Sequence, residues 1–124
     1  GTREWTDYQV TARMTPHMCQ AGGIGVRAQG MTRYYALLLD QEKTRLVRAF
    51  EGKDIVLAEV AGGWKFGHSY ELNLKVQGKR LTASINGQIV LSAEDPEAAY
   101  AGGGIALISE VGRIGCEHVE VRPL

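Results

Sequence analysis

The chain has 124 residues, of which 44% are hydrophobic, and its Lys+Arg and Asp+Glu counts balance at 14 each. This length suits one domain, and the zero net charge argues against a nucleic-acid-binding protein, because such domains usually carry a clear basic excess. No apolar run reaches the roughly 20 residues that span a bilayer, and no signal-peptide pattern opens the chain. We therefore expect neither nucleic acid nor membrane as a partner.

The chain begins at Gly1, only a few residues before the first expected strand. We therefore expect residues 1–124 to form a single domain excised from a longer protein, and we make no prediction of its compartment. Cys19 and Cys116 do not predict a zinc site, because two thiols need two further ligands and the nearest histidines lack a finger spacing. Free thiols are the expected state, with a disulfide between them as the alternative.

Sixteen glycines divide the chain into short segments rich in Val, Ile, Leu, Thr and Tyr. Short strands at such regular spacing predict an all-β sandwich or barrel. The segments around Tyr8–Met14 and Ile24–Ala28 alternate apolar and polar residues, which is typical of half-buried strands.

The segment Arg33–Asp40 is apolar at nearly every position. Because a strand sends alternate side chains to opposite faces, Tyr34, Ala36 and Leu38 share one face, while the other face carries Tyr35, Leu37 and Leu39. This pattern predicts a central strand that is covered on both sides, or one whose second face lines a groove. We expect Tyr35 and Leu37 on that second face.

The later segments predict hairpins. Residues 46–50 and 55–60 flank a turn, and residues 70–76, 81–85 and 88–91 form a meander whose last turn is Asn86-Gly87, the pair that a type I′ turn favours. We expect a short helical turn or a long crossover over residues 92–100. Residues 104–110 and 116–122 then predict two final strands, of which the last pairs with the first.

The order of these segments resembles that of concanavalin A-like, laminin G-like jelly-roll domains. The resemblance rests on residues 5–10, 23–27 and 33–40 and, in the second half, on residues 70–76, 81–87 and 102–107. It implies an all-β fold, a two-sheet antiparallel sandwich of the concanavalin A-like lectin and glucanase type. More narrowly, the chain is similar to C-terminal accessory domains of bacterial glycoside hydrolases and ADP-ribosylglycohydrolase-like proteins, which implies a non-catalytic role in sugar binding at a concave sheet or at the rim.

Catalytic residues are not expected. A glycosidase needs two carboxylates across a cleft, whereas Glu117 and Glu120 face opposite ways in a strand. Glu94, Asp95 and Glu97 suit a solvated turn. Neither a nucleophile elbow nor a glycine run followed by a helix is present.

We expect no cofactor and no metal site, with structural calcium as the alternative. Calcium takes six to eight oxygen ligands, and carboxylates are frequent among them. Asp40, Glu42 and Asp54, or Asp95 with Glu97, are the candidate ligands, although none forms a recognisable calcium loop.

The predicted ligand-binding residues are Arg27, Gln29, Tyr35, Arg48 and Trp64. The first four lie on successive expected strands and would line one concave sheet, where an aromatic ring stacks on a sugar and planar polar groups bind its hydroxyls. Trp64 would stack at the rim. The alternatives are that Tyr35 is a core residue, that Trp64 caps the sandwich and that Arg27 is solvated.

The sequence therefore predicts a carbohydrate-binding, lectin-like accessory module of a larger, bacterial hydrolase, with a glycan as its ligand and no enzymatic activity of its own. The alternative is a structural domain that packs on a parent catalytic domain or forms a homodimer. An exposed apolar patch at residues 37–39 would favour that alternative.

Overall fold

The computed structural model describes residues 7–17, 21–29, 33–51, 53–65, 67–95, 104–110 and 113–123. These residues form strands and turns, and this part of the chain contains no helix long and apolar enough to cross a membrane. The strands are β1 (Tyr8–His17), β2 (Ala21–Ala28), β3 (Arg33–Leu39), β4 (Lys43–Phe50), β5 (Lys53–Ala61), β6 (Tyr70–Gln77), β7 (Arg80–Ile85), β8 (Gln88–Glu94), β9 (Gly104–Glu110) and β10 (Arg113–Pro123).

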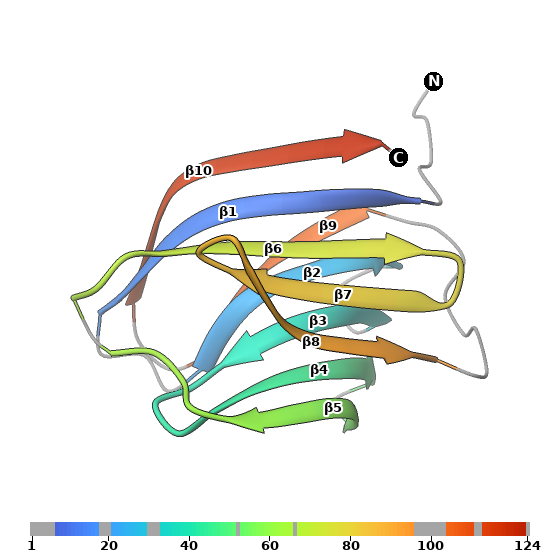
Figure 1. Ribbon diagram of the computed structural model, residues 1–124, viewed down its shortest axis with the longest axis horizontal. Coiled ribbons are helices and arrows are strands. Elements are labelled where there is room, and N and C mark those ends of the chain that lie inside the picture. Colours follow the sequence, from blue (N-terminus) through green and yellow to red (C-terminus); the bar gives the residue numbers. More distant parts are fainter. Residues whose placement is uncertain are drawn as a thin grey trace.

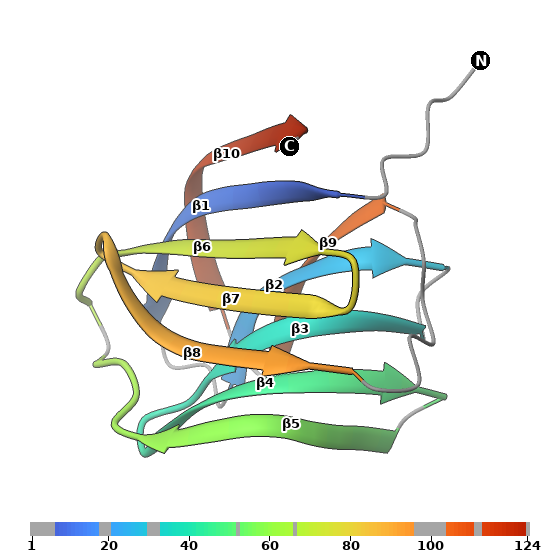
Figure 2. The same ribbon diagram turned by 45° about the vertical axis from the view of Figure 1, so that its right-hand side comes forward.

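Two antiparallel sheets pack face to face (Figures 1 and 2). The front sheet has the strand order β10-β1-β6-β7-β8, and the back sheet has the order β5-β4-β3-β2-β9. β10 pairs with β1, as the sequence predicts, and β6, β7 and β8 form the expected meander. The predicted two-sheet sandwich is confirmed.

The core lies between the sheets and follows the predicted alternation. Alternate residues of β1 and β6 form its front-sheet side, and the residues of β2, β3 and β4 that face them form its back-sheet side. All but one of the largest fully buried side chains among the described residues belong to this core: Trp64, Tyr8, Tyr35, Met14, Ile24, Leu37, Leu39, Leu46, Leu72, Leu74 and Leu81. The exception is Leu38, on the outward face of the back sheet.

β3 is the central strand of the back sheet, and both of its faces are buried, as its composition predicts. However, Tyr35 and Leu37 face the shared core, so the expectation that they line a groove is wrong. The outward face carries Ala36 and Leu38. The alternation alone defined two faces but could not say which one meets the opposite sheet.

Turn chemistry also matches the prediction at the β7–β8 hairpin. Asn86 and Gly87 have φ values of 52° and 84°, the positive values that a type I′ turn requires. Residues 92–94 continue β8, so the expected turn or crossover does not begin at residue 92. The rest of that expectation, residues 96–100, lies outside the described residues, as do Cys19 and the side chain of Cys116.

Candidate functional site

One end of the sandwich gathers most of the buried charge. β2 and β4 end there and β3 begins there in the back sheet, while β6 and β8 end and β7 begins there in the front sheet. We call this the charged end. It lies on the right in Figure 1, where the first residues of β1 also lie.

Arg27 ties the two sheets together at the charged end. The residue has a φ of 51° beside the register shift of the β2–β9 pairing, which is unusual for a residue other than glycine. Its side chain is 4% exposed, donates to the carbonyl oxygen of Gly78 at 2.6 Å, and pairs with Asp7 at 3.2 Å. Its backbone N–H donates to the Tyr8 hydroxyl at 2.6 Å, while burial raises the pKa of that hydroxyl.

A second buried network joins the sheets next to Arg27. The Tyr35 hydroxyl donates to Asp95 Oδ2 at 2.6 Å, and one guanidinium nitrogen of Arg48 lies 3.0 and 3.1 Å from the two oxygens of the same carboxylate. The side chain of Asp95 is 2% exposed, and that of Arg48 is 12% exposed. Since a charge this deeply buried needs partners, the three side chains act as one unit.

Exposed residues surround this network at the surface. The Arg33 guanidinium lies 4.9 Å from the centroid of the Phe50 ring and donates to Glu51 at 2.8 Å. Phe50 is 44% exposed, and the exposed Gln29 lies nearby, because its N–H donates to the Arg33 carbonyl oxygen. We call Gln29, Arg33, Phe50 and Glu51 the rim cluster. An aromatic ring beside a guanidinium and an amide is suited to a sugar, which has both apolar ring faces and hydroxyls.

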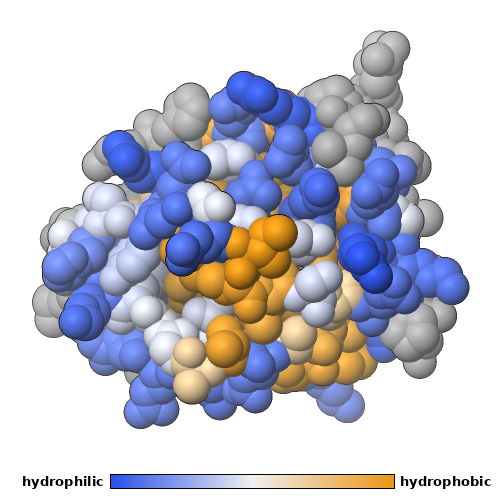
Figure 3. Space-filling model, in the orientation of Figure 1, coloured by the Kyte–Doolittle hydropathy of each residue, from blue (hydrophilic) through white to orange (hydrophobic). Residues whose placement is uncertain are grey.

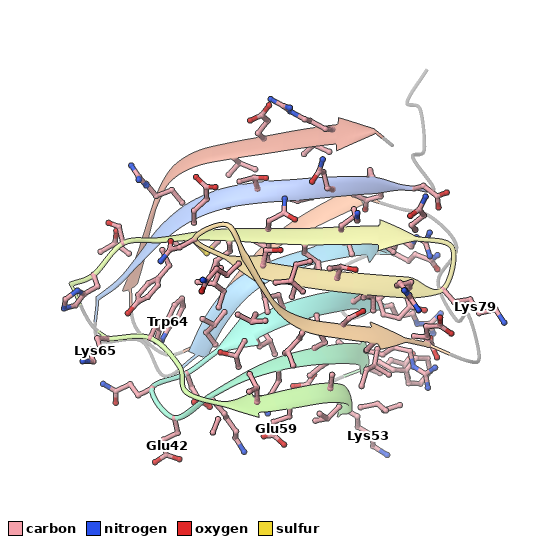
Figure 4. The ribbon with its side chains drawn as sticks, in the orientation of Figure 1. Glu42, Lys53, Glu59, Trp64, Lys65 and Lys79 are labelled. Carbon is pink, nitrogen blue, oxygen red and sulfur yellow. The ribbon has the colours of Figure 1, made fainter. Side chains whose placement is uncertain are left out.

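Trp64 lies at the opposite end of the sandwich, in the segment between β5 and β6 (Figure 4). It is 1% exposed and belongs to the core, so the expectation that it stacks a ligand at the rim is corrected in favour of the alternative that it caps the sandwich. Its backbone N–H donates to the Asp40 carbonyl oxygen at 2.9 Å. The preceding Gly63 packs so closely that an added Cβ would lie 1.7 Å from the same oxygen.

The structure thus brings four of the five predicted site residues to the charged end. Arg27, Tyr35 and Arg48 point between the sheets and not onto an outer concave face, so their predicted orientation is wrong. Buried protein partners hold all three, and the fourth residue, Gln29, is exposed and donates its backbone N–H to the Arg33 carbonyl oxygen.

Sequence reasoning missed Arg33 and Phe50, and it assigned Asp95 to a solvated turn, whereas its side chain is buried. The signal for the first two was the hairpin register, which places Phe50 directly opposite Arg33. No local pattern could join Asp95 to Tyr35, because 60 residues separate them.

Two of the carboxylates proposed as calcium ligands already have protein partners. Asp40 Oδ1 accepts the N–H groups of Glu42 and Lys43, both at 2.7 Å, and Asp95 is held by Tyr35 and Arg48. In the described ranges no group of three or more His, Cys, Asp or Glu side chains is placed to hold a metal ion. The absence of a cofactor stays a prediction.

Comparison with known proteins gives structural matches. No protein-family model matches the chain, and no curated protein is similar to it in sequence. Among solved structures, carbohydrate-binding module CBM66 from Bacillus subtilis superposes with a TM-score of 0.88 at 16% identity, covering 98% of this chain and 78% of that one. Sheep galectin-11 superposes with a TM-score of 0.66 at 12% identity, covering 94% of this chain and 90% of that one.

The family GH43 protein BlXynB from Bacillus licheniformis contains a similar portion, with a TM-score of 0.69 at 12% identity. That match covers 96% of this chain but 28% of the longer protein. At such low identities the similarity shows the fold alone, and the predicted kinship with ADP-ribosylglycohydrolase-like proteins stays a prediction. The chain is a two-sheet jelly roll of the concanavalin A-like type.

Proposed function

We propose that this domain is a non-catalytic carbohydrate-binding module and that it binds its glycan at the rim cluster of the charged end. The observation that carries the proposal is the grouping of an exposed aromatic ring, a guanidinium, an amide and a carboxylate at one end of a rigid sandwich. The ring supplies an apolar surface for a pyranose or furanose, and the polar groups provide directed hydrogen bonds.

The buried networks support this role by fixing the strand ends that carry the rim cluster. Arg48 lies two residues before Phe50, the last residue of β4. Its ion pair with Asp95 holds the end of β4 against the end of β8. Binding residues placed on a rigid framework lose little entropy when a ligand binds.

The structural neighbours give independent support, because a carbohydrate-binding module and a galectin share this fold. The match within a longer GH43 protein supports the finer proposal that the domain serves as an accessory module of a hydrolase.

The proposal is tested by isothermal titration of the purified domain with a panel of neutral oligosaccharides at millimolar concentration. We expect at least one oligosaccharide to bind, and we expect Phe50→Ala and Arg33→Ala to weaken it about tenfold or more, since each removes an exposed contact. Lys65→Ala is the matched control, because Lys65 is exposed at the opposite end. No binding by the wild-type domain, or equal loss with Lys65→Ala, would sink the proposal.

A second candidate function, protein interaction, is favoured by an apolar patch elsewhere. Ile55, Val56 and Val60 on β5 are 43%, 46% and 40% exposed, and Ile89 on β8 is 71% exposed. Figure 3 shows hydrophobic surface over the region where Figure 1 places β5 and β8. The patch lies on these edge strands and not at residues 37–39, which are buried. Dimers in a light-scattering concentration series would support this candidate, and a monomer at all concentrations would argue against self-association.

A further inference from the structure

A row of three residues crosses the back sheet at the charged end. The register of the strand pairs places Phe50 of β4 opposite Arg33 of β3 on one side and opposite Lys53 of β5 on the other. Because alternate residues of a strand share a face, this row lies on the same side of the sheet as Tyr35, which belongs to the core. The row therefore continues the core-facing side of the back sheet beyond the core.

All three residues of this row are exposed at the surface. The Arg33 guanidinium lies over the Phe50 ring, and its charge is compensated by Glu51 at 2.8 Å. Lys53 occupies the other side of Phe50 in the register. An accessible aromatic ring is thus flanked by a neutralised cation on one strand and by a lysine on the next.

A second lysine reaches the charged end from the front sheet. Lys79 lies in the turn between β6 and β7, and its carbonyl oxygen accepts the backbone N–H of Asp95 at 3.0 Å. Since Asp95 also holds Arg48, two residues before Phe50, this turn lies beside the row. Figure 4 shows Lys53 at the start of β5 and Lys79 in the β6–β7 turn, both at the charged end.

The arginines and the lysines of the charged end differ in their partners. In the described part of the chain, neither Lys53 nor Lys79 forms an ion pair, and the neighbouring Asp54 lies on the opposite face of β5 from Lys53. The arginines each have a carboxylate, in the pairs Arg27–Asp7, Arg33–Glu51, Arg48–Asp95 and Arg80–Glu94. The two lysines therefore add uncompensated positive charge beside an exposed aromatic ring.

This combination is suited to a sugar that carries an acid group. The apolar face of a sugar ring packs on an aromatic side chain, and a lysine ammonium attracts an anionic oxygen as a point charge, without the fixed geometry that a guanidinium demands. Such attraction acts at an exposed surface and needs no buried pocket. The ring of Phe50 favours a saccharide over an anion that has no apolar face.

We propose that the ligand of the rim cluster is an acidic saccharide, whose carboxylate or sulfate groups pair with Lys53 and Lys79 while one sugar ring packs on Phe50. The inference rests on the carbohydrate-binding function proposed above and names the class of glycan that the site selects. Arg33 and Glu51 compensate each other, so they contribute to binding of hydroxyls and not to selection by charge.

The test uses matched forms of glucose-, galactose- and mannose-based tetrasaccharides: neutral, oxidised at C6 to the uronate, and sulfated at C6. Each form is titrated calorimetrically into the domain at low salt. We expect an acidic form to bind about fourfold more tightly than its neutral parent, because an exposed ion pair contributes modestly and two lysines are available. The form that binds more tightly identifies the acid group, and its advantage should decrease as salt is added.

Substitutions assign the preference to individual residues. Lys53→Gln and Lys79→Gln should each reduce the preference for the acidic form about twofold, and the double variant should abolish it. Phe50→Ala should weaken the neutral and acidic forms alike, since the ring contacts the sugar and not its acid group. Lys65→Gln is the matched control, because it lowers the net charge by the same amount at the opposite end and should leave the preference unchanged. Circular dichroism would confirm that each variant is folded.

The inference is overturned by equal binding of acidic and neutral forms or by a preference that persists in the double variant. An equal loss in Lys65→Gln would assign the preference to the net charge of the domain, and equally tight binding of tetraglutamate would assign the site to an acidic peptide; either result also overturns it. If neutral tetrasaccharides bind in a Phe50-dependent way and the acid groups add nothing, this inference alone is disproved. If no saccharide binds in any form, both proposals fail.

Discussion

The two ends of the sandwich are closed by different physical means. At the charged end, Arg27 and the Tyr35–Arg48–Asp95 network join the sheets through directed hydrogen bonds and ion pairs. At the opposite end, Trp64 fills the space between the sheets with one large ring, and its Nε1 atom makes no hydrogen bond. Hydrogen bonds and ion pairs fix the orientation of the strand ends that they join, whereas the packing of one apolar ring stabilises the core without fixing such an orientation. The charged end is therefore the end suited to presenting binding residues.

We expect the largest loss of stability from substitutions of Trp64, at the end opposite the charged end. Trp64→Ala should lower the free energy of unfolding by about 4 kcal/mol, because it leaves a large cavity. Trp64→Phe should cost only about 1–2 kcal/mol, since the indole N–H forms no hydrogen bond that could be lost. Urea unfolding measures both variants, and a Phe variant as unstable as the Ala variant would contradict the purely apolar role.

Removing the charge of Asp95 at the charged end should lower the free energy of unfolding by slightly less. Asp95→Asn removes the negative charge that pairs with the mostly buried Arg48 guanidinium, and it should lower the free energy of unfolding by about 3 kcal/mol. The neighbouring Glu94→Gln is the control, because the Arg80–Glu94 pair is exposed and should change stability by less than about 1 kcal/mol. Similar losses in the two variants would show that Asp95 is no more important than a surface carboxylate.

The contribution of Arg27 has two parts that can be separated. Arg27→Ala should lower the free energy of unfolding by about 2 kcal/mol, because it removes the bonds to Gly78 and Asp7 and leaves an alanine at a positive φ. Arg27→Gly loses the same bonds but tolerates that φ, and it should be more stable than the Ala variant by about 1 kcal/mol. If both variants unfold at the same urea concentration, the backbone at residue 27 is not strained.

The smallest effect is a pH dependence at Tyr8. Burial raises the pKa of its hydroxyl above 10.0, so the folded state favours the neutral form. The corresponding stability is intact below pH about 10, the pKa of an unfolded tyrosine, and decreases as the pH rises towards the folded value. Tyr8→Phe should reduce this alkaline loss in unfolding measurements between pH 8 and 11, and an unchanged slope would disprove the assignment.

Most of the fold could be predicted from the sequence. The alternation in β1 and β6 assigned their core faces correctly, and Asn86-Gly87 identified its hairpin turn, because side-chain period and turn conformation are local properties. The pairing of the last strand with the first was also predicted and is confirmed.

The candidate site was predicted only in part. Gln29, Tyr35 and Arg48 were identified by residue type, but Tyr35 and Arg48 were assigned to an outer surface when they face Asp95 inside. Arg33 and Phe50 were missed, because their contact depends on the register across a hairpin.

The sequence by itself determined where the strands run, that β3 is apolar on both faces and which residue types were available for binding. Only the tertiary structure decided which face of β3 meets the front sheet, that Trp64 caps one end and that Asp95 neutralises Arg48. Period and turn chemistry act over a few residues, whereas these decisions depend on contacts between segments that are distant in sequence. The strand that is apolar on both faces thus contributes one face to the core and the other to a small outward cluster beside Arg45.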